Sequence, residues 1–292
     1  MKIAVIGANG QFGSDIVHAA HARGIETLAL KHSESDVSDA AALARALAPL
    51  AAGDVAINTA AIHKTDEVEA RAGDAVAINT VGAFNVARAA SERGARCVYV
   101  STDYVFDGVK RTPYVESDAP NPINVYGATK AVGETLAGWF GNSLVIRVSA
   151  LFGIAGSSGK GGNFVETMIA KGRAGETPRV VNDIVTSPTS TADAAGLLLD
   201  LLGRRAPSGI YHLANEGSVS WRDFADEIFA LCGLSLRAQP ICSRDLPAAA
   251  RRPPYSALAS ERLLPLGLRT RPWREALADY LHAKGHAPRA AP

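Results

Sequence analysis

Two side chains with the types and spacing for acid–base chemistry are Tyr126 and Lys130, which lie four residues apart. On a helix over residues 127–136, this spacing places the phenol and the ammonium side by side on one face. A tyrosine with a pKa near ~10 is a poor acid–base catalyst at neutral pH, and lowering that pKa by about 3 units takes roughly 4 kcal/mol. An ammonium ~4 Å away contributes about that much at an effective dielectric constant of about 20, so the pair predicts a catalytic tyrosine.

A third candidate, Thr102, follows the apolar run of residues 97–100, which predicts a buried parallel strand. The hydroxyl of Thr102 would then lie at the carboxyl edge of a sheet, where ligands bind, and could meet Tyr126 and Lys130 at one carbonyl group. A Tyr-x-x-x-Lys spacing alone is also typical of a solvated helix face. The strand end and a glycine-rich loop near the amino terminus are what favour catalysis.

That loop follows a predicted strand over residues 2–6 and opens a helix, with the spacing Gly-x-x-Gly-x-x-Gly. Such a loop lets the backbone approach a pyrophosphate, and the helix N-terminus adds free N–H groups and a favourable dipole. A plain strand-to-helix turn is the alternative. The loop residues predicted to bind a dinucleotide are Gly7, Asn9, Gly10, Gln11, Phe12 and Gly13.

The second predicted strand, residues 26–30, ends without an acidic residue to bind the adenosine ribose. Lys31 stands there, so it would face either a 2′-phosphate, which favours NADPH over NADH, or water. Asp36 and Val37 are a polar and an apolar residue suited to the edge and face of an adenine. The strand over residues 54–58 ends in a turn whose small side chains, Ala60 and Ala61, suit close packing against a cofactor.

Further along the chain, we assign Asn79, in a crossover helix predicted over residues 75–90, to the cofactor site. His63 is a candidate substrate residue or an ordinary surface histidine. Arg251 and Arg252 lie in a proline-stiffened segment that would either clamp a diphosphate or form a surface loop. The residues assigned to the substrate are His63, Thr102, Asp103, Tyr104, Asn163, Phe164, Arg251 and Arg252.

The alternation of strands and helices through Val148 predicts an α/β fold, a doubly wound parallel sheet of Rossmann type over residues 1–150. Residues 151–292 are expected to form mainly a smaller α/β substrate lobe, with a segment near 189–204 returning to pack on the first domain. The glycine-rich stretch 153–162 predicts a lid. Its one charge, Lys160, would reach a substrate phosphate or remain solvated.

Composition limits the class of protein: the 292 residues are 47% hydrophobic and 20% charged, as in a globular protein. With 30 Lys and Arg against 29 Asp and Glu, and no basic run, we expect no nucleic-acid partner. Cys97, Cys232 and Cys242 lack metal or redox spacing, so no metal site is predicted and a reducing cytosol fits. No apolar stretch approaches the ~18 residues that cross a bilayer, which predicts a cytoplasmic protein without membrane contact.

Several motifs together resemble the dTDP-4-dehydrorhamnose reductase family of the extended short-chain dehydrogenases/reductases. The resemblance runs from Met1 to about Leu281, and Ser-Thr-Asp-Tyr-Val-Phe is its most specific part. The motifs are Gly-Ala-Asn-Gly-Gln-Phe-Gly, Asn-Thr-Ala-Ala, Ser-Thr-Asp-Tyr-Val-Phe-Asp-Gly, Asn-Val-Tyr-Gly-Ala-Thr-Lys, Gly-Gly-Asn-Phe, Ser-Pro-Thr and Ala-Arg-Arg-Pro.

The resemblance implies an NAD(P)H-dependent reductase of a nucleotide-linked, dTDP-type 4-keto-6-deoxysugar, with Thr102, Tyr126 and Lys130 as the catalytic set. Two departures lie on the sugar side: Ala150-Leu151 replaces a common tryptophan, and Ile62-His63 replaces a pair ending in threonine. A cofactor-binding regulatory subunit and a nucleotide-sugar epimerase or dehydratase remain alternatives. A homodimer is compatible with the sequence, which does not by itself predict an assembly.

Overall fold

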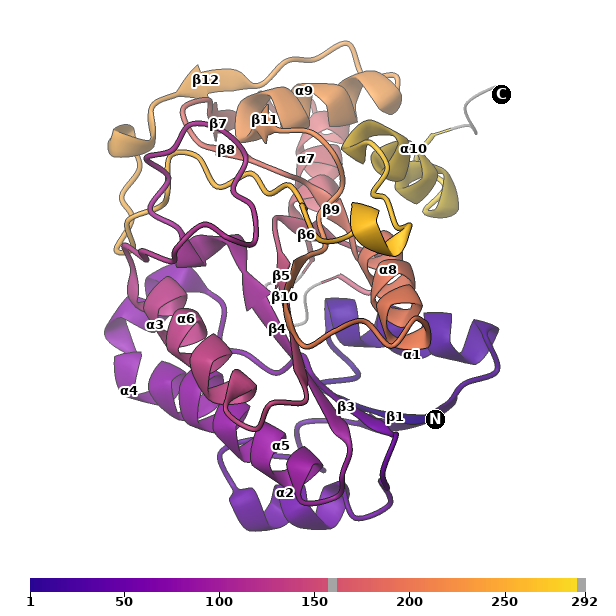
Figure 1. The fold of residues 1–292 in the computed structure, drawn as a ribbon. Helices are drawn as coiled ribbons and strands as arrows, with labels where there is room; N and C mark the ends of the chain where they lie inside the picture. The colour runs from indigo at the N-terminus through magenta and orange to yellow at the C-terminus, as the bar shows by residue number, and fades with distance from the viewer. Residues whose placement is uncertain (157–161, 288–292) are drawn as a thin grey trace.

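The computed structural model describes residues 1–156 and 162–287, and its largest layer is a six-stranded parallel sheet (Figure 1). The strand order is β10-β5-β4-β3-β1-β2, so the chain moves outward from β1 to β2 and then returns to the other side of β1. This reversal confirms the predicted doubly wound α/β fold. The strands are β1 (Lys2–Ile6), β2 (Glu26–Leu30), β3 (Val55–Asn58), β4 (Arg96–Thr102), β5 (Ser143–Val148) and β10 (Gly209–His212).

Helices cover both faces of the sheet, which is why its central strands are mostly apolar. Successive side chains of a strand point to opposite faces. Ile3 and Val5 therefore pack with α1 and α8, and Ala4 and Ile6 with α2 and α5. The helices are α1 (Gln11–Ala22) and α8 (Thr191–Gly203) on one face, and α2 (Ala40–Ala46), α5 (Gly82–Ser91) and α6 (Val125–Gly138) on the other.

The crossover helix predicted over residues 75–90 is part of a longer helical region. It is preceded by α3 (Thr65–Ala70) and α4 (Ala72–Ala75), and a π-helical turn, Val76–Val81, joins α4 to α5. A π turn widens the helix locally and is frequent near functional sites. Asn79 lies within this turn, fully buried.

A second lobe contains α7 (Phe164–Arg173), α9 (Trp221–Leu231) and α10 (Trp273–Ala283) around an aromatic core that includes Phe152, Phe224 and Trp273. Three pairs of short strands accompany these helices. They are β6 (Leu151–Phe152) with β9 (Thr189–Ser190), β7 (Arg179–Val181) with β12 (Gln239–Ile241), and β8 (Val185–Thr186) with β11 (Val219–Ser220).

The chain returns to the first layer through α8 and continues there beyond residue 204. Helix α8 packs against α1, and the following strand β10 pairs with β5 in parallel, Tyr211 opposite Ile146. The strand near residues 209–214, which the sequence placed in the second lobe, is therefore the edge of the main sheet. The helix α8 between β5 and β10 lets the chain cross over, so that β10 runs parallel to β5.

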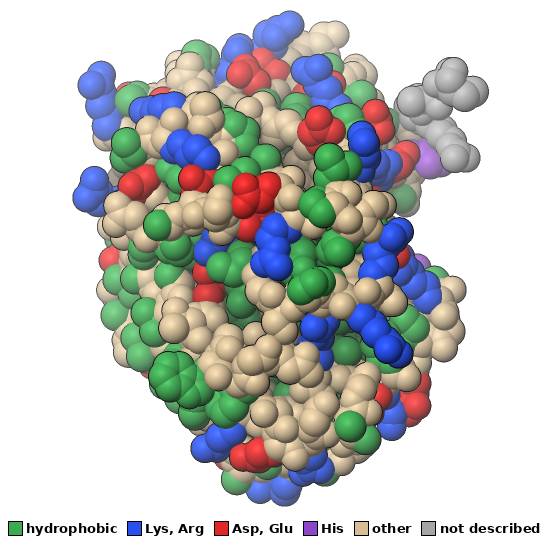
Figure 2. Space-filling model, in the orientation of Figure 1, with side chains coloured by type: hydrophobic (Ala, Val, Ile, Leu, Met, Phe, Trp, Pro, Cys, Tyr) green, Lys and Arg blue, Asp and Glu red, His purple; other side chains and the backbone are tan. Residues whose placement is uncertain are grey.

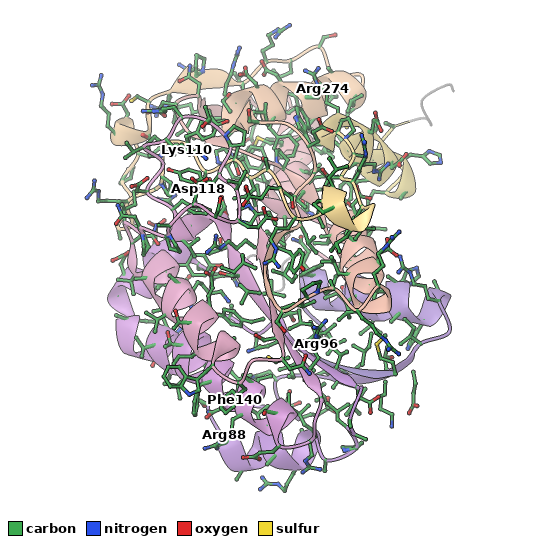
Figure 3. All side chains as sticks on the ribbon, in the orientation of Figure 1. Arg88, Arg96, Lys110, Asp118, Phe140 and Arg274 are labelled. Carbon is green, nitrogen blue, oxygen red and sulfur yellow. The ribbon has the colours of Figure 1, made fainter. Side chains whose placement is uncertain are left out.

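Main-chain bonds also join the lobes at the loop before α6. Tyr114 N donates to Ala257 O at 2.8 Å, and Ala259 N donates to Tyr114 O at 2.9 Å. The same loop is closed by an ion pair of 2.5 Å between Lys110 and Asp118, whose side chains lie in the upper half of Figure 3. These contacts hold the carboxyl-terminal segment across the edge of the sheet.

The molecular surface carries charges of both signs: on the face shown in Figure 2, Lys and Arg side chains are interspersed with Asp and Glu. Within residues 1–156 and 162–287, no helix combines the length and apolar character needed to cross a membrane.

Candidate active site

A cavity of about 1450 Å³ lies at the carboxyl edge of the sheet and is lined by both lobes. Single small-molecule pockets are typically about 300–1,000 Å³, so this one has room for a cofactor and a substrate together. The predicted residues that line it are Gly7, Asn9, Gly10, Gln11, Phe12, Gly13, Val37, Ala60, Ala61, His63, Thr102, Asp103, Tyr104, Tyr126, Lys130, Asn163, Phe164 and Arg252.

Four predicted residues do not line this cavity: Lys31, Asp36, Asn79 and Arg251. Lys31 is exposed, and the carboxylate of Asp36 is occupied within its own turn, where it accepts hydrogen bonds from the backbone and side chain of Ser38. Those bonds lower the pKa of Asp36. The main-chain oxygen of Arg251 accepts from Asn124 at 2.8 Å, so this residue anchors α6 instead.

Asn79 lies behind the residues that line the cavity and holds two of the segments that carry them. Its side chain exchanges two hydrogen bonds with the backbone of Ile62, at 2.9 and 3.0 Å, and donates to Thr129 Oγ1 of α6 at 3.1 Å. The amide therefore fixes the turn after β3 relative to the helix that carries Tyr126. In the structure Asn79 supports the cavity and does not face it.

The glycine loop fits a dinucleotide. Gly7 has φ +81°, and a Cβ atom there would lie 2.6 Å from Thr59 Oγ1. A Cβ on Gly13 would lie 2.3 Å from Gly7 O, so only glycine allows this close packing of strand, loop and helix. Gln11 adds a buried side-chain oxygen without a hydrogen-bond partner among the described residues, an acceptor available to a ligand in the cavity.

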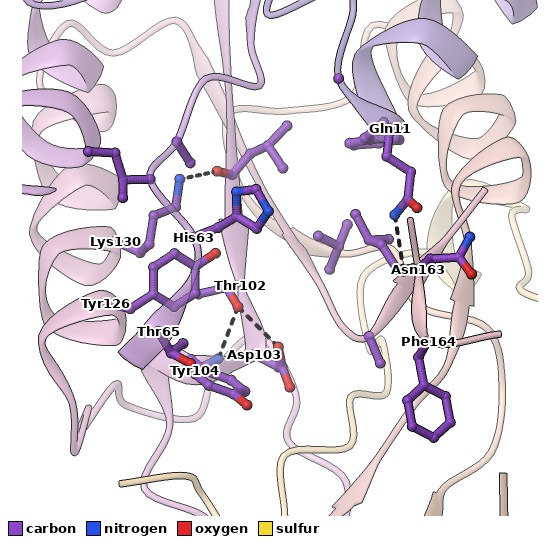
Figure 4. Close-up of a pocket in the computed structure, with 18 of the residues that line it drawn as sticks. Gln11, His63, Thr65, Thr102, Asp103, Tyr104, Tyr126, Lys130, Asn163 and Phe164 are labelled. Atoms are coloured by element: carbon purple, nitrogen blue, oxygen red, sulfur yellow. Dashed lines mark hydrogen bonds between the residues drawn. The ribbon is translucent and has the colours of Figure 1, made fainter. Parts of the chain in front are cut away.

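Tyr126 and Lys130 reach the cavity because α6 begins just before them. The side chain of Asn124 caps the helix by accepting from Gly127 N at 2.7 Å. Thr102 comes from the last residue of β4, as predicted, and Figure 4 shows it beside Tyr126, with Lys130 one turn further along the helix. The three candidate catalytic side chains therefore lie on one side of the cavity.

The electrostatic effect expected between Lys130 and Tyr126 is absent from the structure. Lys130 Nζ donates to Val100 O at 2.6 Å and lies 4.1 Å from the centre of the Tyr99 ring. Burial lowers the pKa of Lys130 to about 7, although the charge of Glu134 opposes the shift. Burial also raises the pKa of Tyr126 above its usual value, against a hydrogen bond with Thr102. Loss of water therefore outweighs the nearby ammonium, which is bound to Val100.

Besides Tyr126, Thr102 is hydrogen-bonded to its own sequence neighbours. Thr102 Oγ1 donates to Asp103 Oδ1 at 3.0 Å and accepts from Tyr104 N at 3.3 Å (Figure 4). The ring of Tyr104 meets that of Tyr126 edge to face, with centroids 5.9 Å apart.

Behind the catalytic helix lies a buried ion pair between Glu134 of α6 and Arg147 of β5. The guanidinium binds both carboxylate oxygens, Nε to Oε1 at 2.9 Å and Nη2 to Oε2 at 2.7 Å. Ser101 Oγ donates to Oε1 at 2.5 Å. The pair fixes α6 against the sheet one turn beyond Lys130.

The close approach of α6 to the sheet depends on Gly133. A Cβ there would lie 2.4 Å from Tyr99 Oη and 2.5 Å from Asn79 O, whereas one on Gly138 of the same helix meets nothing within 4 Å. We expect Gly133→Ala to lower the free energy of unfolding by about 1–3 kcal/mol by overpacking. The matched Gly138→Ala should be neutral or stabilising by up to roughly 1 kcal/mol. Urea unfolding measures both, and equal effects would contradict this account of the helix contact.

On the substrate side, Arg252 is engaged by Asp66 of α3, with Nη2 to Oδ2 at 2.6 Å. Asn163 caps α7, accepting from Glu166 N at 3.0 Å and donating to Gly153 O at 3.1 Å. Phe164 packs edge to face on Trp221 with centroids 4.7 Å apart. Lys160 and half of the predicted lid, residues 157–161, lie outside the described residues.

Some cavity-lining residues were not predicted from the sequence. His32, Ser35 and Ser38 follow β2, and Trp221 and Phe224 come from α9. The serines could have been found as small polar residues beside the predicted adenine site. Ser256, which also lines the cavity, lies far along the chain and gives no local signal.

Comparison with known proteins adds a further finding. The model of the family described as the RmlD substrate binding domain matches residues 1–285. The spore coat polysaccharide biosynthesis protein SpsK of Bacillus subtilis is 34% identical, covering 98% of this chain and 99% of that protein. The dTDP-4-dehydrorhamnose reductase of Mycolicibacterium smegmatis is 37% identical, covering 97% and 85%. The structure of dTDP-4-dehydrorhamnose reductase from Bacillus anthracis in complex with NADP is 33% identical, with a TM-score of 0.90 over 97% of this chain and 99% of that one.

Proposed function

Because the chain belongs to the dTDP-4-dehydrorhamnose reductase family, we propose that it reduces the C4 keto group of a nucleotide-linked 4-keto-6-deoxysugar. The substrate is dTDP-4-dehydrorhamnose and the product dTDP-rhamnose. One observation carries the proposal: Thr102, Tyr126 and Lys130 line the same cavity as a glycine loop at the N-terminus of α1. A reductase needs this combination of a dinucleotide cradle and a proton donor.

NADPH, or NADH, supplies the hydride when it is bound. The glycine loop holds the pyrophosphate, since the N-terminus of α1 offers free N–H groups there. Tyr126 gives its proton to the oxygen of the reduced carbonyl, and Thr102 donates a hydrogen bond to the same oxygen. Lys130 holds the cofactor ribose and, once its ammonium leaves the Val100 carbonyl, lowers the pKa of Tyr126.

The substrate lies against the second lobe, whose lining offers an aromatic pair, Phe164 and Trp221, to a nucleobase. Arg252 binds the diphosphate by exchanging the Asp66 carboxylate for phosphate oxygens. His63 and Tyr104 flank the sugar, at the turn after β3 and the end of β4. Asn163 shapes the site through its bond to Gly153.

A steady-state assay tests the function. Adding dTDP-4-dehydrorhamnose to the protein with NADPH should consume NADPH in proportion to the dTDP-rhamnose formed, which NMR identifies. An epimerase would interconvert the sugar without net loss of NADPH. A protein that binds NADPH but leaves the keto sugar unchanged would be a regulatory subunit, and the proposal would be wrong.

The preference for NADPH over NADH is expected to depend on His32 more than on Lys31. His32 lines the cavity with Ser35 and Ser38, whereas Lys31 does not. His32→Ala should weaken NADPH binding about 3- to 10-fold, as loss of one phosphate contact does, and leave NADH binding nearly unchanged. Lys31→Ala is the matched control. Fluorescence titration of each variant with NADPH and with NADH measures the two affinities. A larger loss of NADPH affinity in Lys31→Ala than in His32→Ala would show that Lys31 contacts the 2′-phosphate.

A further inference from the structure

Asp103 is a buried carboxyl group in the wall of the catalytic cavity, 4% exposed and directly after Thr102. Its side-chain partners among the described residues are hydroxyl groups, not cations. Ser149 Oγ donates to Oδ2 at 3.0 Å and Ser256 Oγ donates to Oδ2 at 2.5 Å. Thr102 donates to Oδ1 at 3.0 Å. The three hydroxyl hydrogen bonds stabilise the carboxylate, but no cation accompanies it, so burial favours its neutral, protonated form.

This arrangement limits what Thr102 can do. A threonine hydroxyl has one proton, and here that proton points to Asp103. While Asp103 is ionised, Thr102 can only accept hydrogen bonds, so it cannot donate one to a keto oxygen. If Asp103 is protonated, Oδ1–H donates to Thr102 Oγ1, and the Thr102 proton is free to point into the cavity.

The surroundings of Asp103 make the protonated form accessible. Burial raises the pKa of Asp103 to about 6, against the three hydroxyl bonds that lower it. The titratable groups facing it are the phenols of Tyr104 and Tyr126, both kept neutral by burial. Lys130, His63 and Arg252 line the same cavity. A negatively charged cofactor and substrate, by adding charge and excluding water, would raise the pKa of Asp103 further.

We propose that Asp103 is a positioning residue: in its protonated form it donates to Thr102, and so turns the Thr102 proton toward the keto oxygen. This rests on the proposed reductase function and adds a reason why a carboxyl group follows the strand-end threonine. Ionised Asp103 is the inactive form, because the Thr102 hydroxyl then donates its hydrogen bond to Asp103 and not to the keto oxygen of the substrate. Turnover therefore falls as the pH rises through the pKa of Asp103.

The experiment is the pH profile of the hydride-transfer rate, followed by NADPH absorbance in single turnovers between about pH 5 and 9. Ser256→Ala removes a hydroxyl that lowers the pKa of Asp103, so the fall should move to higher pH by on the order of one unit. Ser260→Ala is the matched control, since this hydroxyl lies in the same segment but binds Glu116. Its profile should not move.

Asp103→Asn gives a second test. The side-chain amide of the new asparagine donates to Thr102 at every pH. The decrease in rate assigned to ionisation of Asp103 should therefore vanish, and only the decrease at higher pH, where Lys130 loses its proton, should remain. Asp103→Ala removes the partner and should cost about tenfold or more in rate at every pH. Infrared difference spectra of the NADPH complex should show a protonated carboxyl band that Asp103→Asn lacks.

Two results would overturn the role of Asp103: an unshifted profile in Ser256→Ala, or the full wild-type fall retained in Asp103→Asn. Either could occur with normal wild-type turnover, which would leave the reductase function intact. Failure of the wild-type protein to oxidise NADPH would instead overturn the function itself, and the role of Asp103 with it.

Discussion

Replacing Tyr126 with phenylalanine should lower kcat by about 10²–10⁴ while leaving NADPH binding in place, because a positioned general acid contributes this much. The change removes only the hydroxyl group, and the phenyl ring can keep its edge-to-face contact with Tyr104. The free energy of unfolding should therefore change little. Stopped-flow absorbance gives the rate, and fluorescence titration gives the cofactor affinity.

Tyr104→Phe is the matched control for Tyr126→Phe. Both variants lose one phenol oxygen from the same cavity, but only Tyr126 lies in the helix register with Lys130. Tyr104→Phe should lose less than about tenfold in kcat. Equal decreases of kcat in the two variants would contradict the role of Tyr126 as proton donor. A lower free energy of unfolding in Tyr126→Phe alone would indicate that this tyrosine is structural.

Arg147→Met should lower the free energy of unfolding by roughly 3–5 kcal/mol, because it leaves the Glu134 carboxylate buried without its cation. Arg147 is 0% exposed and binds both carboxylate oxygens of Glu134. Its Nη1 also lies 3.4 Å from His212 Nε2. His212 Nδ1 faces Ala259 O at 2.8 Å and carries the proton, so Nε2 accepts from the arginine. The substitution thus leaves two buried groups, the Glu134 carboxylate and His212 Nε2, without their hydrogen-bond donor.

A double variant separates the ion pair from the packing of the long side chain. Glu134→Leu combined with Arg147→Met removes both charges and should recover much of the stability lost in Arg147→Met alone. Arg23→Met is the surface control, because the Arg23–Asp200 pair is exposed and worth at most about 1 kcal/mol. Urea unfolding at neutral pH measures all three. A loss in Arg147→Met no larger than in Arg23→Met would contradict the proposed structural role of the pair.

The stability of α6 and its chemistry are connected through this pair. Glu134 lies one helical turn beyond Lys130, and its charge raises the pKa of Lys130 against the effect of burial. Residual turnover in the double variant Glu134→Leu/Arg147→Met, which lacks the charge of Glu134, is therefore expected to fall off at lower pH than in the wild type, since Lys130 loses its proton earlier. The Arg147–Glu134 pair thus supports the fold and the charge of the catalytic lysine together.

Local patterns in the sequence were enough to predict the features that depend on short segments of the chain. The continuous apolar run of residues 97–100 placed Thr102 at the end of β4, and the spacing of four residues placed Tyr126 with Lys130 on one face of α6. The glycine loop was recognisable because its backbone geometry excludes side chains at Gly7 and Gly13. These signals were sufficient to predict the doubly wound sheet and the cavity at its edge.

The partners of the predicted side chains, in contrast, come from distant parts of the chain and became visible in the folded protein. Asp103 meets Ser149 and Ser256, which lie 46 and 153 residues away in the chain, and no local pattern specifies such pairs. Lys31 and His32 are neighbours at the end of an edge strand, so the turn that follows, and not residue type, decides which one lines the cavity. The charge state of Lys130 depends on burial by several elements at once. Burial is a sum over packing from the whole chain, which is why spacing alone predicted a lowered tyrosine pKa where the structure shows a raised one.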